Sequence, residues 1–99
     1  MSPLKKELQA RAGDLTDVVI KPSKFGPSVA FWVNGKEFAH FHKGNEIEIR
    51  LTKALVRKLK PDYRLETDWN RDWLVAHFET EEDLDFVMKV LEKAYREYR

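Results

Sequence analysis

The chain has 99 residues, of which 42% are hydrophobic and 35% charged, and its formal net charge at pH 7 is +1. This length accommodates one domain with one hydrophobic core, and the hydrophobic share excludes the composition of a disordered segment. The chain has no cysteine, which excludes disulfides, thiolate metal ligands and thiol nucleophiles.

Charge is distributed unevenly along the chain. Residues 1–60 hold 12 Lys and Arg against 6 Asp and Glu, whereas residues 61–99 hold 6 against 11. Two such halves pack together in one domain and their fields partly cancel, so we interpret them as complementary parts of one fold. The large charged fraction with few Asn and Gln is typical of heat-stable proteins. No apolar run approaches the roughly 20 residues of a membrane span and the N-terminal segment is charged, so we expect a cytoplasmic protein without a membrane partner.

The N-terminal part predicts a helix, a short strand and a loop. Ser2 can cap a helix over residues 3–12 that begins with proline and ends at Gly13. The β-branched residues 18–20 predict a strand. Two prolines and a glycine indicate that residues 21–28 form a loop.

A three-stranded meander is expected next. Residues 28–33 and 36–42 are predicted strands, joined by Asn34-Gly35, because both central residues of a type I′ turn need a positive φ. Residues 46–51 alternate strictly between charged and apolar side chains. The alternation separates an inward set, Ile47, Ile49 and Leu51, from an outward set, Glu46, Glu48 and Arg50.

The remaining chain predicts a helix, a strand and a final helix. Thr52 can cap a helix over residues 53–59 with a basic outer face. Residues 62–70 are expected to be a polar connection, and residues 71–78 a strand. The last helix follows a capping box that starts at Thr80, and its apolar stripe should cover the sheet. The order α-β-β-β-β-α-β-α predicts a single α+β domain over residues 1–99, a mainly antiparallel sheet with helices packed on one face.

The central hairpin resembles a known family. Residues 31–42, Phe-Trp-Val-Asn-Gly-Lys-Glu-Phe-Ala-His-Phe-His, hold a glycine turn, a glutamate and a His-x-His strand end, followed by an alternating strand and a helix. This pattern resembles the luciferase-domain family of small bacterial and fungal proteins. The strand at residues 72–75 and the closing helix also fit, so the likeness covers about residues 28–98, with His40 and His42 as its most distinctive element. The resemblance implies a small domain of this family and no particular reaction.

A second, weaker likeness concerns architecture. The pattern Val-x-Gly-Lys-x-Phe-Ala at residues 33–39 is similar to the MmcQ/YjbR family, whose fold is described as a double wing and which is sometimes labelled DNA-binding. This likeness implies a shared architecture rather than a shared activity.

The three histidines are the first candidate site. His40 and His42 are separated by one residue, so they lie on one face of a strand, where two imidazoles could bind one metal ion. His77 lies on another predicted strand, and Glu46 or Glu48 could add a carboxylate ligand. A metal site held by His40 and His42, a proton-handling or non-metal ligand site, and a structural pair are the three alternatives.

The charged residues of the meander are the second candidate. If Lys36 lies on the same face as the two histidines and the outward set, the sheet would present a polar surface opposite its helices. Glu37 belongs to the same set of charged residues. Such a surface can bind a small ligand, whereas cross-strand ion pairs worth about 0.2–1 kcal/mol each are the structural alternative. The expected ligand-binding residues are His40, His42, Glu46, Glu48, Arg50, His77 and Trp69, the last because it lies in a polar stretch and could rim a groove.

A basic helix face provides the nucleic-acid alternative. Its residues are Lys53, Arg57, Lys58 and Lys60. The low net charge and the acidic start of the last helix oppose phosphate binding, so we do not expect a nucleic-acid partner. The sequence has no Gly-rich phosphate loop, Gly-x-Ser-x-Gly elbow or His-Glu-x-x-His motif.

These observations favour a small ligand-binding or structural module without a cofactor. Its partner would be a small ligand or a protein, and exposed aromatic side chains on the open sheet face would favour a homodimer. The alternatives are a metal- or His-dependent enzyme using His40 and His42, and nucleic-acid binding through the basic second helix.

Overall fold

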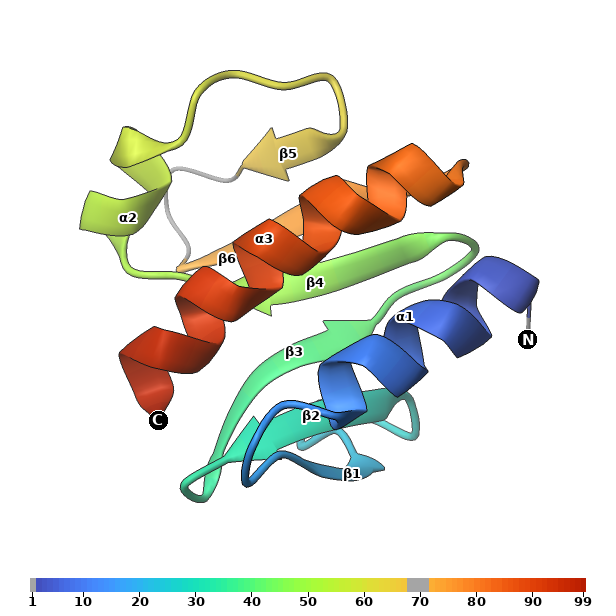
Figure 1. Ribbon diagram of the computed structural model, residues 1–99. Helices are drawn as coiled ribbons and strands as arrows, with labels where there is room; N and C mark the ends of the chain where they lie inside the picture. The colour runs from blue at the N-terminus through green and yellow to red at the C-terminus, as the bar shows by residue number, and fades with distance from the viewer. Residues whose placement is uncertain (1, 68–71) are drawn as a thin grey trace.

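The computed structural model describes residues 2–67 and 72–99, over which the chain forms three helices and six strands (Figure 1). In chain order these are α1 (Pro3–Gly13), β1 (Val19–Pro22), β2 (Val29–Val33), β3 (Lys36–Phe41), β4 (Glu46–Arg50), α2 (Lys53–Lys58), β5 (Leu65–Thr67), β6 (Trp73–His77) and α3 (Glu81–Tyr98).

The six strands form one antiparallel sheet in the order β1-β2-β3-β4-β6-β5. The helices α1 and α3 lie side by side on one face of it, and α3 packs against β3, β4 and β6 (Figure 1). The predicted α+β domain with an antiparallel sheet and helices on one face is therefore confirmed. The observed order is α-β-β-β-β-α-β-β-α, one strand more than expected.

The additional strand is β5, which lies within the predicted polar connection of residues 62–70. It pairs antiparallel with β6 at the edge of the sheet. Only Leu65 of this strand is partly buried, and Glu66 and Thr67 are exposed. A three-residue edge strand with a single apolar side chain has no alternation that a sequence pattern could detect. The prediction of a polar connection without a strand was therefore wrong for residues 65–67.

The opposite edge strand, β1, is longer than predicted. It includes Lys21 and Pro22, which were expected in the loop. A proline lacks a backbone N–H, and this costs no ladder hydrogen bond on the outer side of an edge strand. The remaining loop, residues 23–28, connects β1 to β2.

Local predictions for the meander are confirmed. Asn34 and Gly35 have φ values of 53° and 73°, as a type I′ turn requires. The side chains of Ile47, Ile49 and Leu51 are fully buried, and the charged residues between them are partly exposed on the other face. This alternation fixes which face of the sheet is polar.

The helix starts are also as predicted. The side chains of Ser2 and Thr52 each accept a hydrogen bond from the backbone N–H three residues later. Thr80 and Asp83 form a complete capping box at the start of α3. From there α3 buries one stripe against the sheet, and with it the core includes the fully buried side chains of Phe31, Phe38, Phe78, Leu84 and Leu91.

A β-bulge interrupts the pairing of β2 with β3. Phe31 pairs with Ala39. The next residue, Trp32, pairs with Glu37, which leaves Phe38 as an extra residue in β3. An extra residue reverses the alternation of side chains at that point. Phe38 is therefore buried in the core, and the side chain of Glu37 lies on the opposite face.

Candidate functional site

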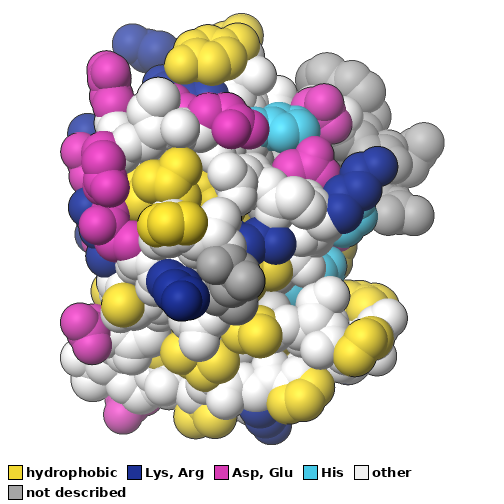
Figure 2. Space-filling model, turned by 90° about the vertical axis from the view of Figure 1, so that its right-hand side faces the viewer, with side chains coloured by type: hydrophobic (Ala, Val, Ile, Leu, Met, Phe, Trp, Pro, Cys, Tyr) yellow, Lys and Arg dark blue, Asp and Glu magenta, His cyan; other side chains and the backbone are white. Residues whose placement is uncertain are grey.

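The face of the sheet opposite α1 and α3, here called the open face, carries the histidines. In the part of the chain that the structure describes, no helix lies over it. Figure 2 shows histidine side chains along one side of the molecule with acidic side chains beside them. The predicted polar face exists, and its charged groups contact one another across the strands.

His40 lies between two glutamates. Its Nδ1 is 3.0 Å from Glu37 Oε2 and its Nε2 is 3.4 Å from Glu48 Oε2. The His40 side chain is only 10% exposed. Both ring nitrogens therefore face carboxylate oxygens in a nearly closed environment.

The same alternation continues across the sheet. Glu48 Oε1 is 3.4 Å from His42 Nε2, and His42 Nδ1 is 3.0 Å from Glu46 Oε1. The other oxygen of Glu46 is 3.3 Å from His77 Nδ1, and His77 Nε2 lies 3.2 Å from Glu66 Oε1 without the alignment of a hydrogen bond. We call this series the His–Glu row; in spatial order it is Glu37, His40, Glu48, His42, Glu46, His77 and Glu66.

The hydrogen bond from His42 affects the titration of its partner. It holds the pKa of Glu46 below its usual value, and the nearby His77 acts in the same direction while partial burial opposes it. Glu46 is thus kept as the carboxylate that links β4 to both neighbouring strands.

Glu37 is the buried end of the row. Its side chain has no exposed surface. The carboxylate accepts hydrogen bonds from Ser23 Oγ at 3.0 Å and from the backbone N–H of Lys24 at 2.8 Å, besides the contact with His40. A buried carboxylate is costly unless it is hydrogen-bonded, and here three donors surround it. The same bonds tie the loop of residues 23–28 to the open face.

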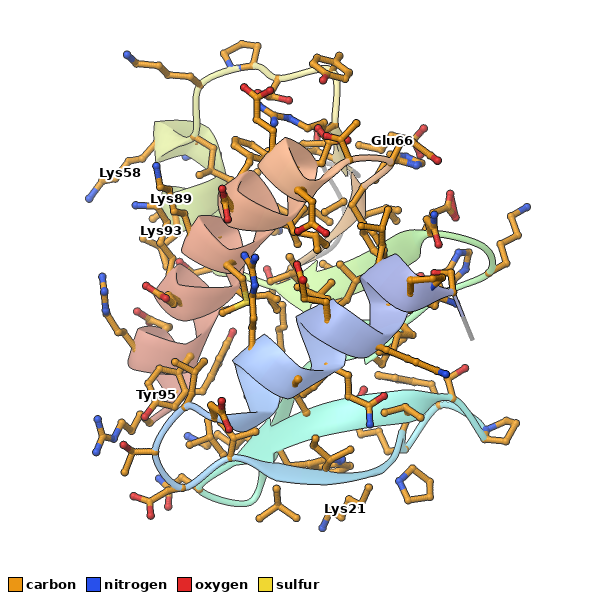
Figure 3. The ribbon with its side chains drawn as sticks, turned by 45° about the vertical axis from the view of Figure 1, so that its right-hand side comes forward. Lys21, Lys58, Glu66, Lys89, Lys93 and Tyr95 are labelled. Carbon is orange, nitrogen blue, oxygen red and sulfur yellow. The ribbon has the colours of Figure 1, made fainter. Side chains whose placement is uncertain are left out.

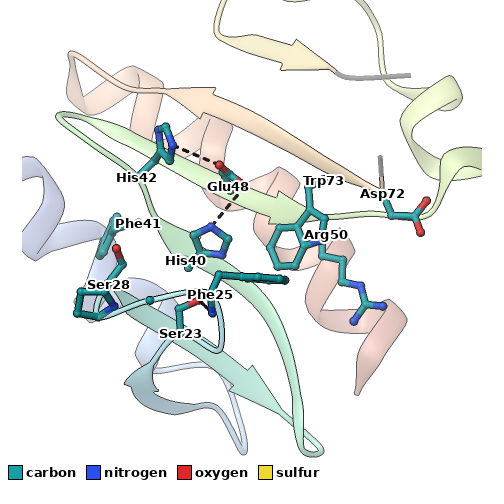
Figure 4. A pocket seen from close by; sticks show the side chains of 12 residues that line it. Ser23, Phe25, Ser28, His40, Phe41, His42, Glu48, Arg50, Asp72 and Trp73 are labelled. Atoms are coloured by element: carbon teal, nitrogen blue, oxygen red, sulfur yellow. Dashed lines mark hydrogen bonds and ion pairs between the residues drawn. The ribbon is translucent and has the colours of Figure 1, made fainter. Parts of the chain in front are cut away.

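A groove lies between that loop and the sheet (Figure 4). Its volume is about 590 Å³. The loop and the sheet each contribute one wall, with the residues Ser23, Phe25, Gly26, Pro27, Ser28, His40, Phe41, His42, Glu48, Arg50, Asp72 and Trp73. Pockets of about 300–1,000 Å³ are the usual size for small organic ligands.

Three rings meet in the groove. The rings of His40 and Trp73 have their centroids 4.9 Å apart, and Phe25 lies 5.7 Å from each of them. Phe25 is 64% exposed although it contacts both rings, so its outer surface faces solvent and the groove. The aromatic cluster offers flat apolar surface directly beside an imidazole (Figure 4).

Opposite charges lie at one end of the groove. Arg50 and Asp72 both line it, and the Arg50 guanidinium also lies 5.0 Å from the ring centroid of Tyr98. Burial is the main cause that raises the pKa of Tyr98, and Asp72 adds to it. At this end, the guanidinium of Arg50 can donate two parallel hydrogen bonds to an anion, and the carboxylate of Asp72 adds a negative charge.

The structure brings six of the seven predicted ligand-binding residues onto one face. His40, His42, Glu48 and Arg50 line the groove, whereas Glu46 and His77 belong to the His–Glu row beyond it. Trp69, the seventh, lies outside the described residues.

Eight of the twelve residues that line the groove were not among the predicted ligand-binding residues, and they include Phe25 and Trp73. Phe25 was predicted only to lie in a loop, and Trp73 only to lie in a strand. Glu37 was recognised as polar, but its burial under His40 depends on the bulge and has no signal in the sequence alone.

No group of three or more His, Asp or Glu side chains within residues 2–67 and 72–99 is arranged to hold one metal ion. The imidazoles of His40 and His42 lie on one face, as predicted, but each faces carboxylates on both nitrogens rather than converging with the other on one point. The metal alternative stays a prediction.

The basic second helix lies apart from the groove. Lys53, Arg57 and Lys58 are exposed on it, and Figure 3 shows Lys58 on the same side of the molecule as Lys89 and Lys93 of α3. The nucleic-acid alternative stays a prediction.

Comparison with known proteins identifies the family. Over the described residues, none of the helices has the length and hydrophobicity needed to span a membrane. Searches of the curated proteins and of the solved structures return no match. The family model of the luciferase domain matches residues 35–94, a segment that contains the His–Glu row from Glu37 to His77 and most of α3. The chain therefore belongs to the luciferase-domain family.

Proposed function

We propose that this protein binds a small organic molecule in the groove between the loop of residues 23–28 and the open face. The observation that carries the proposal is the pairing of a fully buried carboxylate, Glu37, with a groove-lining imidazole, His40. A buried polar pair of this kind contributes little net stability compared with apolar residues of the same size, so the stability of the fold alone does not account for this pair at the wall of a groove.

A purely structural module is the competing interpretation. In that case the His–Glu row would serve as cross-strand pairing on a solvated face. Two features favour ligand binding instead: the groove has the size of a small-molecule site, and Phe25 leaves 64% of its surface exposed beside it. A cross-strand role needs neither feature.

The cellular setting belongs to the same proposal. The absence of cysteine supports a cytoplasmic protein, and the 35% charged residues support high thermal stability. A homodimer formed through the surface around Phe25 would cover the groove, so size-exclusion chromatography with and without ligand is an early control.

The experiment is a fragment screen by amide NMR on the full chain. We expect aromatic carboxylic acids in the panel to shift the amides of residues 24–28, 40–42 and 48–50. Phe25→Ala should weaken these ligands. Tyr63→Ala is the matched control, because it truncates an aromatic side chain that is 85% exposed and does not line the groove. A panel without groove ligands, or equal effects of the two variants, would overturn the proposal.

A further inference from the structure

We infer that the groove binds a free aromatic α-amino acid as its zwitterion. The ring of the ligand packs on the cluster of Phe25, His40 and Trp73, and its two charged groups contact Arg50 and Asp72. This inference rests on the proposed function, since it names the ligand class of the same groove. The ligand is held by non-covalent contacts, and no bond is formed or broken.

The imidazole of His40 offers the groove its ring and not a free nitrogen. Its Nδ1 is 3.0 Å from Glu37 Oε2 and its Nε2 is 3.4 Å from Glu48 Oε2, so both nitrogens already face carboxylates. Glu48 is engaged in the same way, because its other oxygen lies 3.4 Å from His42 Nε2. Among the charged side chains that line the groove, those that remain for a ligand are Arg50 and Asp72.

Arg50 and Asp72 lie at the end of the groove where β4 ends and β6 begins. Arg50 is the last residue of β4, and the carbonyl oxygen of Asp72 accepts a hydrogen bond from the N–H of Leu51 at 2.6 Å. Within residues 2–67 and 72–99, no carboxylate forms an ion pair with Arg50. Its guanidinium lies instead 5.0 Å from the ring centroid of Tyr98. A guanidinium held by an aromatic ring keeps its N–H groups for a bidentate partner.

Two opposite charges at one end of a groove, not paired with each other, favour a ligand that carries both signs. A lone carboxylate would be attracted by Arg50 and repelled by Asp72, and a lone ammonium group would meet the reverse. In a free α-amino acid the carboxylate and the ammonium group are bound to the same carbon atom. One such ligand can therefore accept hydrogen bonds from Arg50 and donate to Asp72 at the same time.

The ring cluster lies directly beside this charged end. Trp73 is the cross-strand partner of Arg50 and the chain neighbour of Asp72. In Figure 4, Arg50 and Asp72 lie to the right of Trp73, and His40 lies to its left. The rings of Phe25 and Trp73 meet at 87°, so a third ring can pack against both. An aromatic side chain one methylene group from the α carbon can contact this cluster while the charged groups stay at the end of the groove.

The test compares probes that differ in one group. L-Phenylalanine carries both charges, 3-phenylpropionate lacks the ammonium group, 2-phenylethylamine lacks the carboxylate, and L-leucine lacks the ring. Each is titrated at pH 7 into the full ¹⁵N-labelled chain, and the amides of residues 24–28, 40–42 and 48–50 report binding. We expect L-phenylalanine to bind at least about 5-fold more tightly than each of the other three, since each lost contact is a partly exposed one.

Two substitutions identify which side chain recognises which charge. Arg50→Gln should weaken the binding of L-phenylalanine and 3-phenylpropionate and strengthen that of 2-phenylethylamine, because a like charge is removed. Asp72→Asn should weaken L-phenylalanine and 2-phenylethylamine and strengthen 3-phenylpropionate. Lys53→Gln is the matched control, because this exposed cation on α2 does not line the groove, and it should change none of the affinities. If Arg50→Gln does not fold, Asp72→Asn and Lys53→Gln decide the matter.

The outcomes distinguish the two proposals. A probe with one charge that binds the groove as tightly as L-phenylalanine overturns the zwitterion and leaves ligand binding intact. Equal binding of L-leucine overturns the role of the ring cluster, and affinities unchanged in Asp72→Asn overturn the role of the charged end. No groove binding by L-phenylalanine, with other ligands found in the fragment screen, overturns this inference alone. An empty screen overturns the proposed function and this inference together.

Discussion

Glu37 and His40 are three residues apart on one strand, yet Glu37 Oε2 and His40 Nδ1 lie 3.0 Å from each other on the same face of the sheet. Regular alternation would place them on opposite faces. The extra residue of the bulge, Phe38, restores the common side. The bulge therefore builds the buried end of the His–Glu row and at the same time delivers an aromatic ring to the core.

Removal of the buried carboxylate should destabilise the fold. Glu37→Ala leaves Ser23 Oγ, the N–H of Lys24 and His40 Nδ1 without their acceptor, and we expect a loss of about 2–4 kcal/mol in the free energy of unfolding. Urea denaturation at pH 7 measures it. Glu66→Ala, at the 70% exposed end of the row, is the control and should change the value by less than about 0.5 kcal/mol. Equal losses of unfolding free energy in the two variants would show that the buried hydrogen bonds of Glu37 stabilise the fold no more than the exposed contact of Glu66 does.

Acid should weaken the fold through Asp62. Its hydrogen bonds with Arg64 lower the pKa of Asp62 from 3.8 to about 2. The folded carboxyl thus binds a proton less tightly than the unfolded one, so its stabilising contribution is complete above about pH 4 and is lost as the pH falls toward 2. Denaturation measured between pH 7 and pH 2 should give wild type a larger free energy of unfolding than Asp62→Asn at neutral pH. This difference should disappear as the pH falls from about 4 toward 2. A constant difference would contradict the assignment.

The start of α3 depends on its capping box. Thr80 Oγ1 accepts from the N–H of Asp83, and Asp83 Oδ2 accepts from the N–H of Thr80, both at 3.1 Å. Thr80→Ala should cost about 1 kcal/mol of unfolding free energy by chemical denaturation. Thr80→Ser keeps the hydroxyl and should retain most of the stability. If both variants lose the same amount, the threonine methyl group rather than the cap is responsible.

The metal alternative has a direct test. Because each imidazole nitrogen of His40 and His42 already faces a carboxylate, we expect native mass spectrometry of untagged protein to show no stoichiometric Zn²⁺, Mn²⁺ or Fe²⁺ after the metal is added. One metal ion per chain, lost in His40→Ala/His42→Ala, would instead support a metalloprotein. The same spectra report whether the protein is a monomer or a homodimer.

Short-range chemistry made much of the fold predictable. The Asn34-Gly35 turn, the alternation of residues 46–51 and the caps at Thr52 and Thr80 each depend on neighbours within about four residues, and the structure confirms all of them. Such signals also placed His40 and His42 correctly on one polar face. The edge strand β5 escaped prediction because its pairing with β6, and not its own pattern, makes it a strand.

The sequence by itself determined the class of fold, the family and the polar face of the sheet, since these follow from local periodicity and from one continuous motif. Only the tertiary structure decided the site. The place of β6 beside β4 brings His77 to Glu46, and the bulge turns Glu37 toward His40. The hydrogen bonds of Glu37 then hold the loop that closes the groove. Strand order, bulges and loop docking depend on packing between residues far apart in the chain, which no local pattern encodes.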